Sequence, residues 1–210
     1  MFKSKKYIVT GIGTDVGKTV ASAVLCTALN ANYWKPVQAG TEPMTDTERV
    51  RGLIPEHLKC FEEHLVLQTP MSPHAAADLE GEHLEIGEIE VPHTLMNLII
   101  EGAGGVMVPL NDTHHYLDLF RLWGYPVIVV IRHYLGSINH SLMTINTLQN
   151  AQVPIAGIVY SGEKHPSSES VIESMTGINV LARIPEMDPV DTKGVQDIAE
   201  AIKSDLEFLK

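Results

Sequence analysis

The chain has 210 residues, of which 44% are hydrophobic and 20% charged, a length and balance typical of a globular domain with a substantial core. Fifteen basic and 26 acidic residues give a formal charge of −11. This charge argues against nucleic acid as a partner, because that binding depends on neutralising phosphates with Lys and Arg. The apolar run after the basic start is too short for a signal peptide, and no run is long enough for a membrane helix. We therefore expect a cytoplasmic protein, and its two cysteines suggest no disulfide framework.

Short apolar runs alternate with longer helical patterns along the chain. Several of the runs lack period-2 alternation, as is typical of parallel strands covered on both faces. The expected strands are residues 7–10, 33–37, 98–101, 127–132, 155–161 and 180–184. The expected helices are residues 18–30, 137–151, 167–175 and 195–209. This order predicts a doubly wound α/β fold, a mainly parallel sheet flanked by helices as in P-loop NTPases, in one domain over residues 1–210.

Two segments do not fit this alternation. Residues 41–68 form a long connection rich in charge and proline, for which we predict a functional loop with some helix. Residues 79–92 are acidic, and we interpret them as a solvated surface segment.

The first chemistry-bearing motif is G-I-G-T-D-V-G-K-T, residues 11–19, between an expected strand and an expected helix. A general P-loop has a glycine where Ile12 stands in this chain. A glycine-flanked loop can carry an additional residue, so the motif predicts phosphate binding by backbone N–H groups and the helix N-terminus. Lys18 would supply a point charge to the phosphates, and the hydroxyl of Thr19 would bind Mg²⁺.

The second motif is L-I-I-E-G-A-G-G, residues 98–105. A carboxylate at the end of a buried apolar strand is typical of the acidic metal ligand beside a bound nucleotide, a role that would fall to Glu101. The alternative interpretation is a strand that stops at a glycine turn. Paired with the phosphate loop, the motif favours the metal ligand.

The third motif is Y-W-K-P-V-Q-A-G, residues 33–40. Lys35 lies in or at the end of a short apolar strand, where a lysine is unfavourable unless it has a partner. Because ligands of open α/β sheets bind at the carboxyl ends of strands, Lys35 could reach the phosphates as a second cation. A lysine that extends from an edge strand to solvent is an equally good interpretation of the residues alone.

These three segments, in this order, resemble the dethiobiotin synthetase family, whose phosphate loop carries the additional residue. The family's T-x-V-G-K-T ends at Thr19, its K-P-V matches Lys35 to Val37, and its E-G-A-G-G matches residues 101–105. Further similarity is found at residues 72–74, 135–140 and 184–185. The resemblance covers most of the chain.

The resemblance implies an enzyme that converts 7,8-diaminononanoate and CO₂ to dethiobiotin with ATP and Mg²⁺, in biotin biosynthesis. The reaction passes through a carbamate and a carbamic-phosphoric anhydride. It also implies a homodimer in which the neighbouring subunit holds the substrate carboxylate. That role would fall to the helix start at Gly136, Ser137, Ile138 and Asn139, a natural anion site.

The resemblance also assigns the remaining site residues. The catalytic residues would be Lys35, Lys18 and Thr14, and Thr14 and Lys35 would also contact the substrate. The metal ligands would be Thr19, Asp46 and Glu101. The nucleotide would be bound by Asp15, Val16, Gly17, Lys18, Thr19, Val20, Glu101, Gly102, Ala103, Gly104, Ser161, Ile184 and Pro185.

Some positions depart from the family pattern or carry no clear role. Ala39 replaces a common Ser or Thr, and Ser161 stands where relatives commonly place an Asn that reads adenine, which leaves the preferred nucleotide base open. The ten histidines show no zinc-like spacing, so we expect structural roles for His74 and His140.

The main alternative is a MinD/ParA-like ATPase switch that acts through protein partners. Such proteins carry an additional lysine near the start of the phosphate loop. In this chain, the loop holds no lysine before Lys18. Membrane-docking members also use a basic C-terminal helix, whereas residues 195–210 hold four acids and two lysines. Both differences favour the enzyme.

Overall fold

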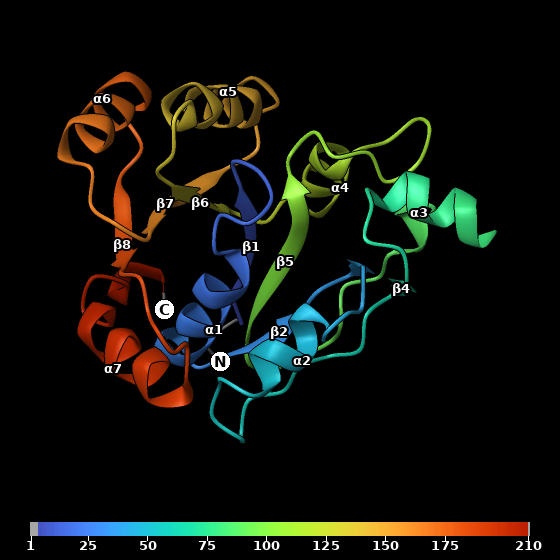
Figure 1. The fold of residues 1–210 in the computed structure, drawn as a ribbon, viewed down its shortest axis with the longest axis horizontal. Helices are drawn as coiled ribbons and strands as arrows, with labels where there is room; N and C mark the ends of the chain where they lie inside the picture. Colours follow the sequence, from blue (N-terminus) through green and yellow to red (C-terminus); the bar gives the residue numbers. More distant parts are fainter. Residues whose placement is uncertain (1–3, 210) are drawn as a thin grey trace.

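A six-stranded parallel sheet organises the fold, with strand order β2-β5-β1-β6-β7-β8 (Figure 1). The computed structural model describes residues 4–209, so the first three residues of the expected domain, with its basic start, and residue 210 lie outside it. The strands are β1 (Lys6–Gly11), β2 (Ala31–Trp34), β5 (Asn97–Gly105), β6 (Val127–Arg132), β7 (Ile155–Ser161) and β8 (Val180–Ile184). The predicted mainly parallel α/β fold is confirmed.

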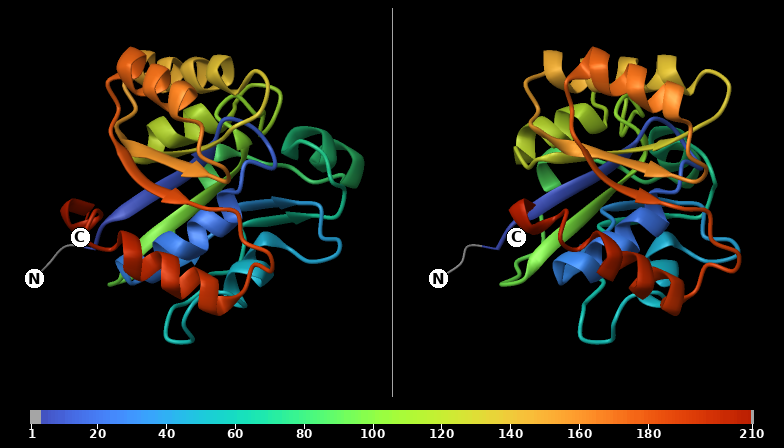
Figure 2. Two further views of the ribbon diagram at one scale, coloured as in Figure 1. Left: turned by 60° about the vertical axis from the view of Figure 1, so that its left-hand side comes forward. Right: turned by 90° about the vertical axis from the view of Figure 1, so that its left-hand side faces the viewer.

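Helices cover both faces of this sheet (Figures 1 and 2). One layer contains α1 (Lys18–Leu29) and α7 (Thr192–Ile202), and the other contains α4 (Tyr116–Trp123), α5 (Ser137–Asn150) and α6 (Pro166–Thr176). Helix α1 packs against the sheet and against α7 beside it, so most of its side chains are buried, including Leu25 and Cys26. The central strands are buried as well, as their continuous apolar runs require. No helix within residues 4–209 is long and apolar enough to cross a membrane.

The prediction of one strand over residues 33–37 is wrong, because the chain leaves the main sheet in the middle of this segment. Strand β2 ends at Trp34, and β3 (Val37–Ala39) pairs with β4 (Leu65–Leu67) in a separate two-stranded parallel sheet. Pro36 cannot donate a backbone hydrogen bond to a continuing ladder, which accounts for the break. Lys35 therefore lies at the junction of two sheets, beside the carboxyl end of β2.

Residues 41–68 contain helix, as predicted: α2 (Asp46–Arg51) lies within them, before β4. Helix α3 (Pro73–Glu80) and a 3₁₀ turn (Ile86–Glu88) follow. Much of residues 79–92 is exposed, as expected, but the buried side chains of Leu84 and Ile89 hold the segment to the core.

Helix α3 was not among the expected helices, and the C-terminal helix and α4 also differ from the sequence-based expectation. The C-terminal helix ends at Ile202, and turns and a 3₁₀ helix (Glu207–Leu209) replace its expected last part. Helix α4 was not predicted, although its sequence Y-L-D-L-F-R-L-W buries Tyr116, Leu119 and Phe120 with helical spacing. Its apolar side chains recur too densely for a short window to separate helix from strand.

Candidate active site

A cleft of about 700 Å³ lies at the carboxyl ends of the strands, where ligands bind to open α/β sheets. Another cleft, of about 670 Å³, lies at the amino end of β1 and holds none of the predicted site residues. The first cleft brings together most of the predicted site residues. These are Thr14, Asp15, Gly17, Lys18, Thr19, Val20, Lys35, Asp46, Glu101, Ala103 and Gly104.

The loop between β1 and α1 folds tightly because of its glycines. A Cβ on Gly11 would lie 2.5 Å from Cγ2 of Val16 and 2.9 Å from the carbonyl oxygen of Gly13. Gly17, at the N-cap of α1, has a φ of 89°, and a Cβ there would lie 2.4 Å from Oγ of Ser161. These contacts explain why glycines occupy both ends of this enlarged loop, although Gly11 lies one residue before the first glycine position of the general motif.

Lys18 extends from the first turn of α1 back over the loop. Its Nζ donates to the carbonyl oxygen of Gly13 at 2.8 Å, and the residue is 8% exposed. Burial lowers the pKa of Lys18, while the carboxylates of Glu101, Asp46 and Asp15 oppose that shift. The ammonium therefore lies beside the loop whose N–H groups are suited to phosphates.

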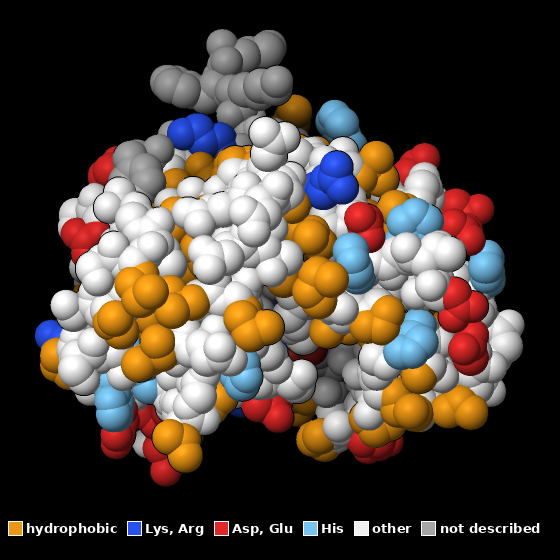
Figure 3. Space-filling model, turned by 90° about the horizontal axis from the view of Figure 1, so that it is seen from above, with side chains coloured by type: hydrophobic (Ala, Val, Ile, Leu, Met, Phe, Trp, Pro, Cys, Tyr) orange, Lys and Arg blue, Asp and Glu red, His pale blue; other side chains and the backbone are white. Residues whose placement is uncertain are grey.

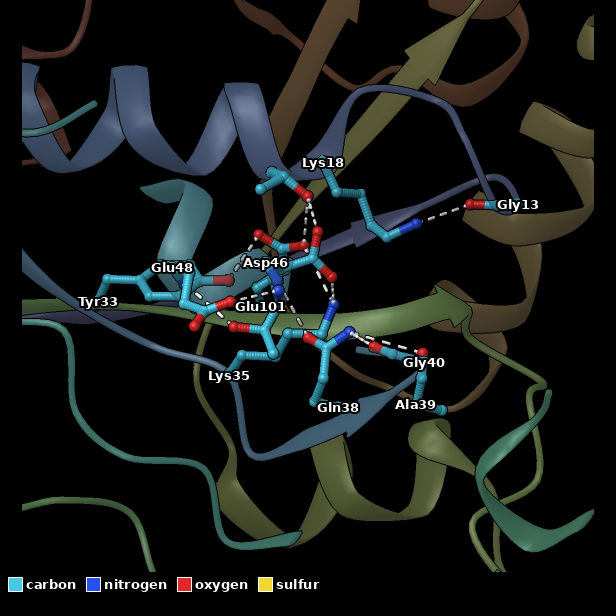
Figure 4. A network of polar contacts seen from close by, with 12 residues as sticks. Gly13, Lys18, Tyr33, Lys35, Gln38, Ala39, Gly40, Asp46, Glu48 and Glu101 are labelled. Atoms are coloured by element: carbon cyan, nitrogen blue, oxygen red, sulfur yellow. Dashed lines mark hydrogen bonds and ion pairs between the residues drawn. The ribbon is translucent and has the colours of Figure 1, made fainter. Parts of the chain in front are cut away.

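Lys35 lies between two carboxylates, as Figure 4 shows. Its Nζ forms a short ion pair with Oδ2 of Asp46 and lies 3.5 Å from Oε1 of Glu101. The residue is 4% exposed. Burial lowers the pKa of Lys35, but the carboxylates of Glu101 and Asp46 outweigh burial and hold the pKa above its ordinary value. The interpretation of Lys35 as a solvent-directed edge lysine is therefore wrong, because its ammonium faces these acids.

Three oxygen donors meet at the start of α1. The hydroxyl of Thr19 lies 2.6 Å from Oδ1 of Asp46 and 3.1 Å from Oε1 of Glu101. Burial raises the pKa of the Asp46 carboxyl, but the Lys35 ammonium and the Thr19 hydroxyl outweigh it, so the pKa falls below its ordinary value. Two carboxylates and a hydroxyl form an oxygen donor set that fits Mg²⁺.

Asp46 is held in place although it comes from the long connection. It is the first residue of α2, whose N-cap Thr45 forms a capping box with Glu48. The backbone N–H of Asp46 also donates to Oε1 of Gln38 at 3.2 Å, and Nε2 of Gln38 donates to the carbonyl oxygen of Gly40 at 2.7 Å. These contacts tie α2 to the end of β3.

The opposite end of the cleft carries a different charged pair. Nη2 of Arg132, at the end of β6, donates to Oε2 of Glu186, beyond β8, at 2.8 Å. Their side chains are 42% and 57% exposed. A Cβ on Gly162 would lie 3.3 Å from that carboxylate oxygen, so a glycine leaves space for the pair.

Some predicted site residues do not line the cleft. Val16 is buried within the phosphate loop, Ile184 is buried in β8, and Ser161 packs behind Gly17. Gly102 and Pro185 are also absent from the cleft walls, as are Gly136, Ser137, Ile138 and Asn139 at the start of α5. At the β8 side the wall is formed by Glu186 and Val190 instead.

Sequence reasoning assigned no role to Tyr33, Arg132 or Glu186. Arg132 ends a correctly predicted strand, so the rule that ligands bind at carboxyl ends could have identified it. Glu186 directly follows the I-P pair of the family pattern. Tyr33 had no such signal, because its partner Glu101 is 68 residues away.

The histidines of the described residues do not form a metal site. Within residues 4–209, no three His, Cys, Asp or Glu side chains are grouped so that they could hold a metal ion. Nδ1 of His74 lies 3.0 Å from Oγ of Ser72, and Nδ1 of His140 lies 2.8 Å from the hydroxyl of Tyr134. Structural roles for both histidines remain a prediction.

The parallel sheet, the phosphate loop between β1 and α1, and the carboxylates beside it define a P-loop ATPase. The AAA domain family matches residues 5–193 of the chain. More particularly, the chain belongs to the ATP-dependent dethiobiotin synthetases. It is 44% identical over 203 residues to the enzyme of Christiangramia forsetii, covering 96% of this chain and 98% of the relative. It is 43% identical over 194 residues to that of Rhodopseudomonas palustris, covering 91% and 92%.

Solved structures with little sequence identity to this chain share its fold. A plasmid partition protein of Borrelia burgdorferi bound to AMPPNP aligns with a TM-score of 0.59 and 12% identity, over 99% of this chain and 98% of that chain. The cell division ATPase MinD of Pyrococcus furiosus aligns with a TM-score of 0.53 and 14% identity, over the full length of both chains. At these identities the likeness shows the fold alone, so the MinD/ParA-like alternative remains a structural relation. The chain is an ATP-dependent ligase of biotin biosynthesis.

Proposed function

We propose that this cleft converts 7,8-diaminononanoate, CO₂ and ATP to dethiobiotin, ADP and phosphate. The observation that carries the proposal is the buried Lys35 ammonium, held between Asp46 and Glu101 beside the phosphate loop. A fixed, desolvated cation at this place is suited to the negative charge of a carbamate and of a phosphoryl group in transfer.

The chemistry has three steps. One amine of the substrate adds to CO₂ and loses a proton, which gives a carbamate. A carbamate oxygen then attacks the γ-phosphorus of ATP, and ADP leaves. Finally the second amine attacks the carbonyl carbon of the anhydride, phosphate leaves, and the ring closes. Because phosphoryl transfer depends mainly on positioning and charge stabilisation, the protein contributes oriented cations and N–H donors.

Each residue has a role in this scheme. The phosphate loop and Lys18 bind the ATP phosphates, and Lys35 stabilises the carbamate oxygen as it attacks. Thr14, exposed at the tip of the loop, contacts the reacting end of the substrate. Thr19, Asp46 and Glu101 would hold Mg²⁺, which would neutralise the phosphate charge when bound.

The sheet order also supports an orientation for the nucleotide. The residues that handle the transferred phosphoryl group come from the β2 and β5 side of β1, whereas Arg132 and Glu186 come from the β6 to β8 side. The phosphates would lie between them, on the loop after β1. The nucleotide base would therefore extend toward Arg132 and Glu186. Ser161 packs behind Gly17, and it does not face this part of the cleft.

The proposal includes a homodimer with the substrate site at the interface. The start of α5 does not line the cleft of its own chain, so a neighbouring subunit would present it. The loop before α5 and the helix expose Tyr134, Leu135, Ile138 and Met143. Hydrophobic side chains lie among polar ones on the face that α5 and α6 form, which Figure 3 views from above. Apolar side chains exposed in this way are suited to an interface.

The decisive experiment is an assay of phosphate release and product formation. We expect both to require ATP, Mg²⁺, bicarbonate and the diamine together, with a cyclic urea as the product. ATP turnover without the diamine, stimulated instead by a protein or a membrane, would contradict the proposal and favour a MinD/ParA-like switch.

Mixing two inactive variants tests the shared site. Lys35→Ala removes the catalytic cation, and Asn139→Trp fills the exposed helix start that would bind the partner's substrate. If the site is shared, mixed dimers contain one site with both native elements, so activity returns on mixing. Absence of any recovery, with subunit exchange verified by differently tagged chains, would place α5 outside the site.

A further inference from the structure

Tyr33 contacts Glu101 of the proposed metal site from strand β2, and it has no role in the scheme above. It lies in β2, next to β5, and its side chain is fully buried. Its hydroxyl donates to Oε2 of Glu101 at 3.1 Å, and Figure 4 shows the phenol directed at that carboxylate. The bond joins neighbouring strands through side chains that are both removed from solvent.

The two oxygens of Glu101 consequently have different partners. Oε1 accepts from the hydroxyl of Thr19 at 3.1 Å and lies 3.5 Å from Nζ of Lys35. Oε2 accepts from Tyr33. The terminal torsion of a glutamate is broad and has no strong preference of its own. A donor on Oε2 therefore sets the rotation of the carboxylate and keeps Oε1 directed at Thr19.

Tyr33 is rigid enough to serve this purpose. Its backbone N–H donates to the carbonyl oxygen of Lys59 at 2.8 Å, and its carbonyl oxygen accepts from the N–H of Phe61 at 2.9 Å. On its other side, β2 pairs with β5, with Tyr33 opposite Ile99.

We propose that Tyr33 is a positioning residue that orients Glu101 for binding of the divalent cation. This inference rests on the proposed role of Glu101 as a metal ligand. Outer partners of metal-ligating carboxylates commonly contribute about 10–100-fold to metal affinity. The alternative is that Tyr33 only fills space in the core, in which case its ring suffices and its hydroxyl is dispensable.

Tyr33→Phe removes only the hydroxyl, and the chain offers a matched control. Tyr7 is also buried, and its hydroxyl donates to the carbonyl oxygen of Leu209 at 2.8 Å, away from the cleft. Tyr7→Phe therefore deletes the same atom and a buried hydrogen bond, here to a backbone carbonyl. Both variants are compared with the native chain by thermal unfolding, which reports any general loss of stability.

The main measurement is Mn²⁺ binding in the presence of ADP, followed by the electron paramagnetic resonance signal of free Mn²⁺. We expect Tyr33→Phe to weaken this binding about tenfold, whereas Tyr7→Phe leaves it unchanged. In activity assays, Tyr33→Phe should need more Mg²⁺ for its half-maximal rate and recover most of its rate at saturating Mg²⁺. Native Mn²⁺ affinity in Tyr33→Phe would overturn the inference.

A double-mutant cycle tests whether Tyr33 acts through Glu101. Glu101→Gln keeps the shape of the side chain and removes its charge. In that background, we expect Tyr33→Phe to change Mn²⁺ affinity little further. Fully additive losses would show that Tyr33 acts by another route and would reject the proposal.

Failure of the proposed function would look different from failure of this inference. The Mn²⁺ measurement uses ADP and no diamine. A native chain that binds Mn²⁺ and ADP but makes no dethiobiotin would contradict the function, while the contribution of Tyr33 would still be measured.

Discussion

The two ends of the cleft differ in how far their charged side chains are exposed to solvent. At the β2 and β5 end, the side chains of Lys35 and Glu101 are 5% and 1% exposed. At the β6 to β8 end, those of Arg132 and Glu186 are 42% and 57% exposed. Loss of one partner from a buried pair leaves an uncompensated charge, whereas an exposed pair is screened by water. The buried end is therefore suited to chemistry that needs fixed charges. At the open end, substitution of a charged residue should have a smaller effect.

Lys35→Ala should have the largest effect, because it removes the cation from the buried end. We expect product formation to fall about 10³-fold, the magnitude typical of losing one donor that stabilises a transition state. Nucleotide binding should remain measurable, because Lys18 and the phosphate loop are unchanged. The matched control is Lys164→Ala at an exposed lysine. Normal activity in Lys35→Ala would show that the catalytic assignment is wrong.

Gly17→Ala tests the loop that joins the two ends. The new Cβ would lie 2.4 Å from Oγ of Ser161, at a φ of 89°. The positive φ alone costs roughly 1–2 kcal/mol, so we expect ADP affinity, measured by calorimetry, to fall about tenfold or more. Gly87→Ala, where a Cβ meets no atom within 4 Å, is the control. Equal effects of the two changes would contradict this account of the loop.

We expect the stability of the fold to depend on pH because of His133, which directly follows β6. Its ring stacks on Tyr160 at 5.3 Å and lies 3.5 Å from Glu169, which also pairs with Arg183. Burial lowers the pKa of His133, more strongly than Glu169 raises it. The unfolded chain therefore binds more protons, and stability should decrease as the pH falls through the ordinary histidine pKa of about 6.5 toward the lower folded value.

Substitution isolates this contribution. His133→Phe keeps an aromatic ring beside Tyr160 and removes the titration. We expect thermal unfolding of the variant to depend less on pH between about pH 7 and 5 than that of the native chain. An unchanged pH profile would assign the acid sensitivity to other groups.

Arg132→Ala should have the smallest effect. An exposed ion pair contributes about 0–1 kcal/mol, so we expect the KM for ATP to change less than about fivefold, with kcat retained. Comparison of ATP, GTP and CTP as phosphoryl donors, for the native chain and the variant, would determine the base preference. A loss as large as that of Lys35→Ala would break the distinction between the two ends.

Much of the architecture could be predicted from local pattern. Strands β6, β7 and β8 have the predicted bounds, and α1 begins at the predicted Lys18, because buried parallel strands and helix starts leave short-range signals. The break at Pro36 could have been recognised, since proline interrupts a ladder. Helix α4 was missed because a dense apolar run does not reveal its period.

The sequence by itself determined the chemistry that one continuous segment can specify. Residues 11–19 carry the glycines, the lysine and the hydroxyl of a phosphate loop, and such a loop is closed by contacts among near neighbours. Only the tertiary structure decided which charges face Lys35. Its partners Asp46 and Glu101 lie 11 and 66 residues away, and strand order with the docking of α2 brings them together. Periodicity in a sequence specifies which face is buried, but it carries no information on which distant side chain lies opposite.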